Sequence, residues 1–394
     1  MKLLVAVTLL LATSISTSAL AAELAQKSIP TSVGIEAIHL DIAENASQDP
    51  LQMGSMDASG SPRHRQEKAL LMERLDPKSG TWNKHHPRYR LLEALYGFTE
   101  YQERSMVELN KWRTLYTNVG KAQKKILARA VNYKKKLNSI ESAITQNQHL
   151  CDAIIANAMT YYNISHPELT SHIASAKASK RLPDRVSTTQ TLKHFVRDWA
   201  DDGAQERNDA FPCLLSILAN ITATNPSLTP LTLLLPGSGL GRLGTTIADL
   251  GAFTVTLNEW SAYMNVGYRF LFSPTLSLST PATLHPFVDS LSHHASTENL
   301  LRPIHFPNSA PNPSVLLVEG DFTTAFTTQS THFDIVVTHF FIDTARNLLS
   351  YFETIHMVLK PGGRWVNFGP LLYGTGPFVQ LSLDEVVTVV EEMG

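Results

Sequence analysis

The sequence has 394 residues, enough for one large domain or two ordinary domains with a sizeable core. A formal net charge of -2 and 17% charged residues give no indication of a nucleic-acid partner. Its two cysteines, Cys151 and Cys213, exclude a disulfide scaffold and a cysteine-based zinc site.

Residues 1–22 have the pattern of a cleaved secretory signal. A lysine precedes an apolar run from Leu3 to Ala12, and the segment ends in Ala-Leu-Ala-Ala. The apolar run is too short for a membrane span. We therefore expect a protein of the secretory pathway or the extracellular space, with no membrane span.

Residues 23–85 are rich in polar residues, proline and glycine and show no sustained period, which predicts a poorly ordered lead-in. Residues 86–225 are expected to form a helical N-terminal domain. Its first helix follows Pro87, and a second carries one apolar stripe from Ile126 to Ile144. Lysines surround that stripe, and they indicate either an anionic partner or, with more weight, a solvated helix face.

The stretch from Val186 to Asp202 predicts a further helix with Ser187 as its N-cap. Leu192, Phe195 and Trp199 recur on its apolar side, and Arg197 lies among them. An arginine beside an apolar stripe is usually a surface residue whose stem lies along that stripe.

The stretch from Leu231 to Trp260 has the order strand, glycine loop, helix, strand and carboxylate. Leu231 to Leu235 suit a strand buried on both faces, and Gly237, Gly239 and Gly241 follow at once. Glu259 ends the next strand 22 residues after Gly237, the usual distance for an acid that accepts hydrogen bonds from ribose hydroxyls. Arg242 stands where a dinucleotide site has its third glycine, so S-adenosylmethionine is favoured over NAD.

Three more strands are expected beyond this stretch, at Val315–Val318, Phe333–Val337 and Arg364–Phe368. The first ends in Gly320-Asp321-Phe322, and the second is followed by residues 338–343, Thr-His-Phe-Phe-Ile-Asp. These segments lie at the carboxyl edge of the sheet, where α/β proteins bind ligands. The histidines between residues 273 and 313 follow no metal-ligand frame, so no metal is expected.

Several blocks in order resemble the carnosine N-methyltransferase family. They are LPGSGLGRL, LNEWSAYM, GDF, THFFIDTARN and LKPGGRWVNFGPLLY, within a resemblance that extends from about His86 to the C-terminus. The resemblance implies an α/β fold: a Rossmann-like, class I methyltransferase domain over residues 226–394, preceded by an all-helical domain. It also implies methyl transfer from S-adenosylmethionine to an imidazole nitrogen of carnosine, a small peptide, which gives anserine.

The resemblance further assigns roles to single residues. Arg197 would bind the carboxylate of the methionine moiety, because a guanidinium group can donate two parallel hydrogen bonds to a carboxylate. Asp321 would accept from the adenine amino group and Phe322 would cover the adenine ring. His194 and His339 occupy positions where the family contacts the cofactor through a glutamine and a cysteine.

On the substrate side, the resemblance makes Asp343 the residue that holds the imidazole, with Tyr373 lining the same edge. As an alternative, Asp343 only caps the helix expected at Thr344–Leu359. After LLY the family has a histidine that recognises the substrate, whereas Gly374 to Gly376 follow here. This difference leaves methyl transfer better supported than carnosine itself as acceptor.

The end of the chain predicts a departure from the class I sheet. A helix at Leu381–Met393 follows the fifth strand, so the C-terminal closing hairpin has no sequence to form it. We expect a five-stranded parallel core, an exposed edge at Arg364–Phe368 and reduced activity with carnosine. An open edge invites pairing with another chain, so a homodimer is one expectation.

Two further hypotheses stay open at this point. One is a non-catalytic relative that binds the cofactor or a peptide, and the other is an NAD oxidoreductase. The compartment has an alternative too, because the family works in the cytosol and nucleus, whereas residues 1–22 indicate secretion.

Overall fold

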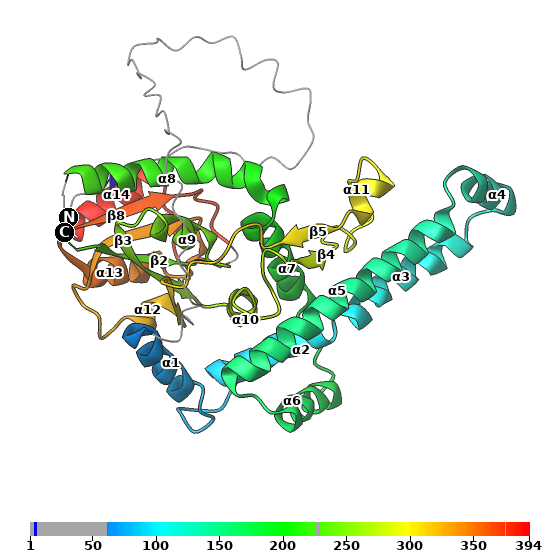
Figure 1. The fold of residues 1–394 in the computed structure, drawn as a ribbon, viewed down its shortest axis with the longest axis horizontal. Coiled ribbons are helices and arrows are strands. Elements are labelled where there is room, and N and C mark those ends of the chain that lie inside the picture. The colour runs from blue at the N-terminus through cyan, green and yellow to red at the C-terminus, as the bar shows by residue number, and fades with distance from the viewer. Residues whose placement is uncertain (1–3, 6–60, 225–228, 375) are drawn as a thin grey trace, which may run out of the picture.

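A computed structural model describes residues 4–5, 61–224, 229–374 and 376–394. They form an α/β unit and a helical body from which two long helices project as an arm (Figure 1). The all-helical segment precedes the sheet in the chain, as the sequence predicts.

One parallel sheet forms the centre of the α/β unit. Its order is β1-β8-β7-β2-β3-β6, in which each strand runs parallel to its neighbours. Leu233, Leu234 and Leu235 in the central β2 are all at most 3% exposed, as expected for a strand covered on both faces. The strands are β1 (Leu4–Val5), β2 (Leu231–Pro236), β3 (Phe253–Glu259), β6 (Leu316–Glu319), β7 (Phe333–His339) and β8 (Leu359–Phe368).

The prediction of five strands and an exposed edge at Arg364–Phe368 was wrong. Leu4 pairs with Val366 and Val5 with Asn367, so β1 adds a sixth strand to the edge of β8. A parallel edge has unpaired backbone groups that any extended segment within reach can bind. The segment used here comes from the predicted signal, and the rest of residues 1–22 lies outside the described residues.

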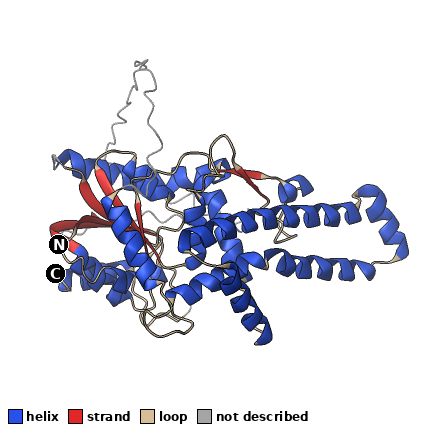
Figure 2. Cartoon of the chain, turned by 60° about the horizontal axis from the view of Figure 1, so that its bottom comes forward, coloured by secondary structure: helices blue, strands red, loops and turns tan. Residues whose placement is uncertain are grey.

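Helices cover both faces of the sheet (Figure 2). Near the C-terminus, Val386 and Val390 of α14 pack in one cluster with Phe352 of α13 and Trp365 of β8. The helix expected from Thr344 begins only at Leu348, and Asp343 lies in a preceding 3-10 turn, η3 (Ile342–Thr344). The helices are α9 (Arg242–Ala248), α10 (Ala262–Phe270), α12 (Phe322–Ala325), α13 (Leu348–Val358) and α14 (Leu383–Glu392).

The helical body contains α2 (Pro87–Thr99), α3 (Tyr101–Thr117), α4 (Lys121–Ala130), α5 (Tyr133–Tyr162), α6 (His166–Ala178), α7 (Arg185–Trp199), η2 (Asp201–Gly203) and α8 (Ala204–Thr224). The single helix predicted across residues 126–144 is two helices. Asn132 between them has a left-handed backbone with φ 45°, and its side chain caps α5 by accepting from Lys135 N. The chain reverses there, so α4 sits at the far end of the arm that α3 and α5 form (Figures 1 and 2).

Part of the predicted lead-in, residues 23–85, is ordered. Pro62–Arg74 form α1, which packs along the edge strand β6, whereas residues 23–60 lie outside the described residues. Arg63 donates to the carbonyl of Val255 at 2.9 Å, and the His64 Nε2 donates to that of Val315 at 3.2 Å. This helix is hard to recognise in the sequence, because Leu71 is its only buried apolar residue and Leu75 follows at the C-cap.

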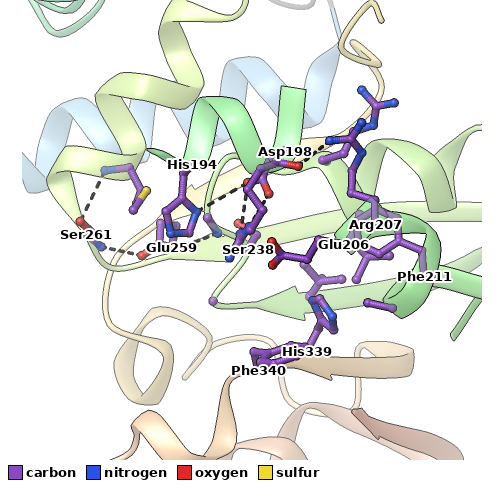
Figure 3. A pocket seen from close by; sticks show the side chains of 18 residues that line it. His194, Asp198, Glu206, Arg207, Phe211, Ser238, Glu259, Ser261, His339 and Phe340 are labelled. Carbon is purple, nitrogen blue, oxygen red and sulfur yellow. Dashed lines mark hydrogen bonds and ion pairs between the residues drawn. The ribbon is translucent and has the colours of Figure 1, made fainter. Parts of the chain in front are cut away.

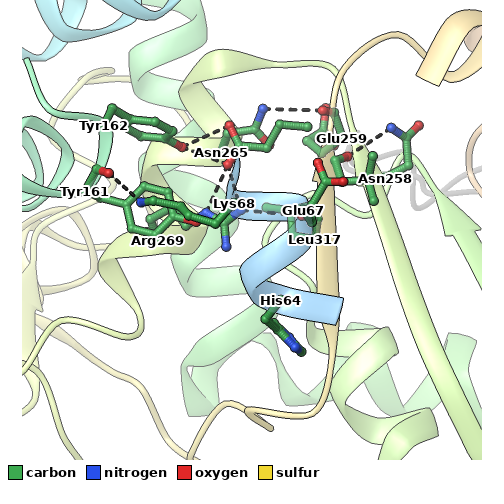
Figure 4. Close-up of polar contacts among 12 residues, drawn as sticks. His64, Glu67, Lys68, Tyr161, Tyr162, Asn258, Glu259, Asn265, Arg269 and Leu317 are labelled. Atoms are coloured by element: carbon green, nitrogen blue, oxygen red, sulfur yellow. Dashed lines mark hydrogen bonds and ion pairs between the residues drawn. The ribbon is translucent and has the colours of Figure 1, made fainter. Parts of the chain in front are cut away.

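A buried polar network joins the helical body to the sheet (Figure 4). The Tyr162 hydroxyl on α5 lies 3.0 Å from both carboxylate oxygens of Glu319 at the end of β6. Arg269 on α10 donates to Glu319 Oε1 through Nε at 2.9 Å and Nη2 at 2.8 Å. Tyr162 and Arg269 therefore share the carboxylate of Glu319, whose side chain is 9% exposed.

Between α10 and β6 the chain forms a small antiparallel hairpin, β4 (Ala282–Leu284) and β5 (Ile304–Phe306), with α11 (Thr297–Leu301) between them. The Asn147 amide on α5 grips the backbone of His285: its Nδ2 donates to the carbonyl at 2.9 Å, and its Oδ1 accepts from the amide at 2.8 Å.

Across the described residues no three His, Cys, Asp or Glu side chains gather into a metal site. The described helices also include none with the length and apolar content of a membrane span.

Candidate cofactor and substrate site

A cavity of about 270 Å³ opens at the carboxyl edge of β2, β3 and β7 (Figure 3). Helices α7 and α8 of the helical body form its other walls. It brings together six of the predicted cofactor residues: His194, Arg197, Gly237, Gly239, Glu259 and His339. The other four predicted residues, Asp321, Phe322, Asp343 and Tyr373, do not line it.

The glycine loop forms one wall of the cavity with left-handed backbone at Gly237 (φ 65°) and Gly239 (φ 56°). A Cβ on Gly237 would lie 2.3 Å from the Phe341 ring, so only glycine fits there. A Cβ on Gly239 would point between the His194 Nδ1, at 3.4 Å, and the Arg197 Nη2, at 3.5 Å. The loop at Gly239 therefore lies close to the polar atoms of α7 that line the same cavity.

Glu259 at the end of β3 is tied to this loop. Its Oε2 accepts from Gly239 N at 2.9 Å and its Oε1 accepts from Ser261 N at 2.7 Å. Burial raises the pKa of Glu259, and the two backbone N–H groups oppose that rise. The carboxylate is thus fixed at the position where the sequence predicts an acceptor for ribose hydroxyls.

Helix α7 supplies the Arg197 guanidinium and the His194 imidazole to the opposite wall. The N-cap of the helix is Asp184, which accepts from Ser187 N at 3.0 Å, so the prediction of Ser187 as the cap was wrong. Arg197 donates from Nε to Asp198 Oδ1 at 2.7 Å and from Nη2 to Oδ2 at 3.3 Å. Burial alone would raise the pKa of Asp198, but Arg197 and His194 hold it well below its usual range.

His339 at the end of β7 is a neutral residue of the cavity. Burial first, and Arg197 second, lower its pKa to about 4. Its ring packs edge-on against Phe211, with centroids 5.9 Å apart, and stacks on Phe368 at 5.8 Å. Both are packing contacts between rings. The Nε2 atom of His339 has no hydrogen bond among the described residues.

Three buried polar atoms that line the cavity form no hydrogen bond among the described residues: His194 Nδ1, which lies 3.7 Å from Asp198 Oδ2, Ser238 Oγ and His339 Nε2. Native proteins rarely leave such atoms unsatisfied, and each costs about 1–3 kcal/mol. A polar ligand that enters the cavity would satisfy them. This observation supports a binding site for a molecule with both donors and acceptors, as the amino-acid end of S-adenosylmethionine has.

Asp321 lines a second cavity, and Phe322, next to it in the chain, lies in the core. Asp321 caps α12, accepting from Thr323 N at 2.9 Å, and lines this cavity with Arg90 and Trp260. The Arg90 guanidinium lies 3.6 Å above the centre of the Trp260 ring. Phe322 is 3% exposed and packs edge-on against Phe341 in the core. Its contact with the adenine ring stays a prediction.

Asp343 and Tyr373 meet in the loop beyond β7 and β8. Asp343 Oδ2 accepts from Leu372 N at 3.0 Å, and its carbonyl accepts from Gly374 N at 3.4 Å. The Tyr373 hydroxyl donates to Leu381 O at 2.6 Å and accepts from Leu381 N at 3.1 Å. In this conformation both hydrogen bonds of the Tyr373 hydroxyl go to the backbone of Leu381. Asp343 Oδ1 has no hydrogen bond among the described residues. The substrate roles of both residues stay predictions.

Comparison with known proteins gives the family. The model of the carnosine N-methyltransferase family matches residues 176–394, more than half of the chain. The chain belongs to this family. It is similar to carnosine N-methyltransferase of Mus musculus, at 28% identity over 318 residues that cover 78% of each chain. It is also similar to that of Schizosaccharomyces pombe, at 30% identity over 288 residues, 67% of this chain and 74% of the relative.

Among solved structures, phosphoethanolamine N-methyltransferase 2 of Haemonchus contortus, in complex with phosphomonomethylethanolamine and S-adenosylhomocysteine, overlaps in part. The identity is 16%, the overlap covers 54% of this chain and 43% of that chain, and the TM-score is 0.34.

The structure adds site residues that sequence reasoning missed in this member of the family. Asp198 holds Arg197, and Ser238 contributes one of the unpartnered atoms. Asp198 could have been found, because a carboxylate follows the apolar side of a helix and is next to the predicted arginine. Glu206, Arg207 and Phe211 of α8 also line the cavity, and no spacing in the sequence connects α8 with the glycine loop.

Proposed function

We propose that this chain transfers a methyl group from S-adenosylmethionine to an imidazole nitrogen of carnosine, giving anserine. Membership of the family supports the reaction. The observation that carries the proposal is the cavity that brings Glu259, bound to the glycine loop, together with Arg197 of α7.

The residues present fit the cofactor. Glu259 would accept from the ribose hydroxyls, and Arg197, held in orientation by Asp198, would face the carboxylate of the methionine moiety. His194 Nδ1, Ser238 Oγ and His339 Nε2 offer further hydrogen bonds. Bound S-adenosylmethionine supplies an electrophilic methyl group on a sulfonium.

Asp343 would act on the acceptor. A free imidazole has a pKa of about 6.5, so near pH 7 much of it is neutral and already nucleophilic. By accepting the N–H of one ring nitrogen, a carboxylate fixes the tautomer and leaves the lone pair of the other nitrogen free for methylation. Orientation of the two reactants, rather than a strong base, then provides most of the rate.

The test is methylation of carnosine by the purified chain with isotopically labelled S-adenosylmethionine, followed by mass spectrometry. We expect one labelled methyl group on the imidazole of carnosine and none on anserine, whose ring already carries a methyl group. Calorimetric titration with S-adenosylmethionine and with NADH should show binding of the former alone. Binding of NADH alone, or donor binding without any methylated histidine peptide, would refute the proposal.

A further inference from the structure

The far end of the arm is the most basic part of the chain. Residues 111–136 contain nine lysines and arginines and no aspartate or glutamate, in a chain whose formal net charge is -2. We call this segment the basic tip. Its cations are Lys111, Arg113, Lys121, Lys124, Lys125, Arg129, Lys134, Lys135 and Lys136.

Few of these cations are neutralised within the protein. Across the described residues, Arg113 is the only one of the nine in an ion pair, with Glu141. The tip stands away from the sheet and from the cofactor cavity (Figures 1 and 2). None of the residues of α4 is buried. The proposed reaction therefore makes no use of this charge.

Large apolar side chains are exposed at the same place. Ile126 and Val131 are 59% and 61% exposed, and Trp112 and Leu115 are 40% and 45% exposed. At about 100° per residue, Ile126 and Ala130 form one stripe of α4, and Lys125 and Arg129 form the stripe beside it, about 100° around the helix. The helix is amphipathic, yet the protein does not cover its apolar side.

We propose that the basic tip binds the surface of a bilayer that carries anionic phospholipid headgroups. A short amphipathic helix with cations on one side and apolar side chains on the other lies in such an interface, with its apolar side in the acyl boundary. A cluster of lysines adds about 1 kcal/mol per residue near an anionic surface. A nucleic acid would satisfy the cations but would leave Ile126 and Val131 in water.

The experiment measures co-sedimentation of the full chain with vesicles of phosphatidylcholine alone and of equal parts phosphatidylcholine and phosphatidylserine. We expect binding to the anionic vesicles only, weakened by salt. The triple variant Lys121→Glu, Lys125→Glu, Arg129→Glu should bind on the order of a hundredfold more weakly, because three attractive charges are reversed. Ile126→Ser should weaken binding as well, without any change of charge.

The matched control is Lys78→Glu, Lys84→Glu, Lys180→Glu, which changes net charge equally at exposed positions outside the tip. It should bind anionic vesicles like the wild type, and both triple variants should keep wild-type circular dichroism. Equal binding to neutral vesicles, or equal loss in both triple variants, would overturn the proposal. So would a wild type that ignores vesicles but binds RNA, or one that forms a dimer which the tip variant alone dissociates.

Discussion

The carboxylate of Glu259 is the residue on which the cofactor assignment depends most. Glu259→Ala removes the acceptor for the ribose and also releases the Gly239 amide. Loss of charge-assisted hydrogen bonds should weaken donor binding by about 1.5–3 kcal/mol. Calorimetric titration with S-adenosylmethionine measures this, with the exposed Glu298→Ala as control. An unchanged affinity for S-adenosylmethionine in Glu259→Ala would contradict the assignment of the cofactor site to this edge of the sheet.

Asp343 is expected to act on the acceptor and not on the donor. Asp343→Asn can present an N–H to the imidazole and so select the tautomer that cannot be methylated at the intended nitrogen. We expect the turnover of carnosine to fall severely, while the affinity for S-adenosylmethionine stays near the wild-type value. Initial rates and calorimetry on the same preparation separate the two effects. Wild-type rates would mean that Asp343 only anchors Leu372.

His339 should make the stability of the protein depend on pH. Its pKa is depressed from 6.5 to about 4 in the folded chain, so its contribution to stability is fully present above pH 6.5 and is lost as pH falls toward 4. His339→Cys, which places the family's residue here, removes this dependence. Across that interval the unfolding free energy of the wild type should fall by on the order of 3 kcal/mol more than that of the variant. Urea denaturation at several pH values measures the difference, and parallel curves would contradict it.

At the scale of elements, α1 is expected to stabilise the edge strand β6. Leu71 is 2% exposed and its neighbour Leu70 is 42% exposed on the same helix. Leu71→Ala should therefore cost about 2–5 kcal/mol of unfolding free energy, whereas Leu70→Ala should cost much less. Denaturant unfolding of the two variants gives a matched comparison. Equal effects would mean that α1 is not part of the cooperative structure.

Sequence reasoning predicted those elements whose pattern is local. The leucines of β2, interrupted only by Thr232, and the glycines that follow them indicate a buried strand and a ligand loop without knowledge of their neighbours. The pairing of Leu4–Val5 with β8 and the packing of α1 on β6 depend on contacts across most of the chain. A strand of two residues and a helix with one buried leucine carry too little periodicity to be recognised before those contacts are known.

The candidate site was predictable to a similar extent. Glu259 follows from its spacing to the glycines, and Arg197 came from the resemblance to the family. The walls that α8 contributes come from tertiary packing alone, whereas Asp198, which binds Arg197, is its neighbour in the sequence and was within reach of prediction. The cap of α7 was misplaced by three residues because Asp184 and Ser187 both suit an N-cap, and only the backbone shows which residue precedes the first turn.

For the whole molecule, we expect the helical body and the α/β unit to unfold together. Glu319 joins Tyr162 of α5 to Arg269 of α10, and α7 supplies one wall of the cofactor cavity. Calorimetry should show one transition. S-adenosylmethionine at a hundred times its dissociation constant should stabilise it by about 2.7 kcal/mol. Two transitions, only one of which responds to the cofactor, would show that the two parts fold independently.

The grip of Asn147 on the backbone of His285 has a consequence for how this protein can diverge. The amide binds both the N–H and the carbonyl of one residue, so it recognises a position in the chain and no particular side chain. The loop residues 277–281 and 289–296 can therefore gain or lose length without loss of the anchor, whereas His285 also bonds the Leu301 carbonyl through its Nδ1 at 2.9 Å. Variation among descendants of this chain should accumulate on both sides of that point, while the asparagine on the helix persists.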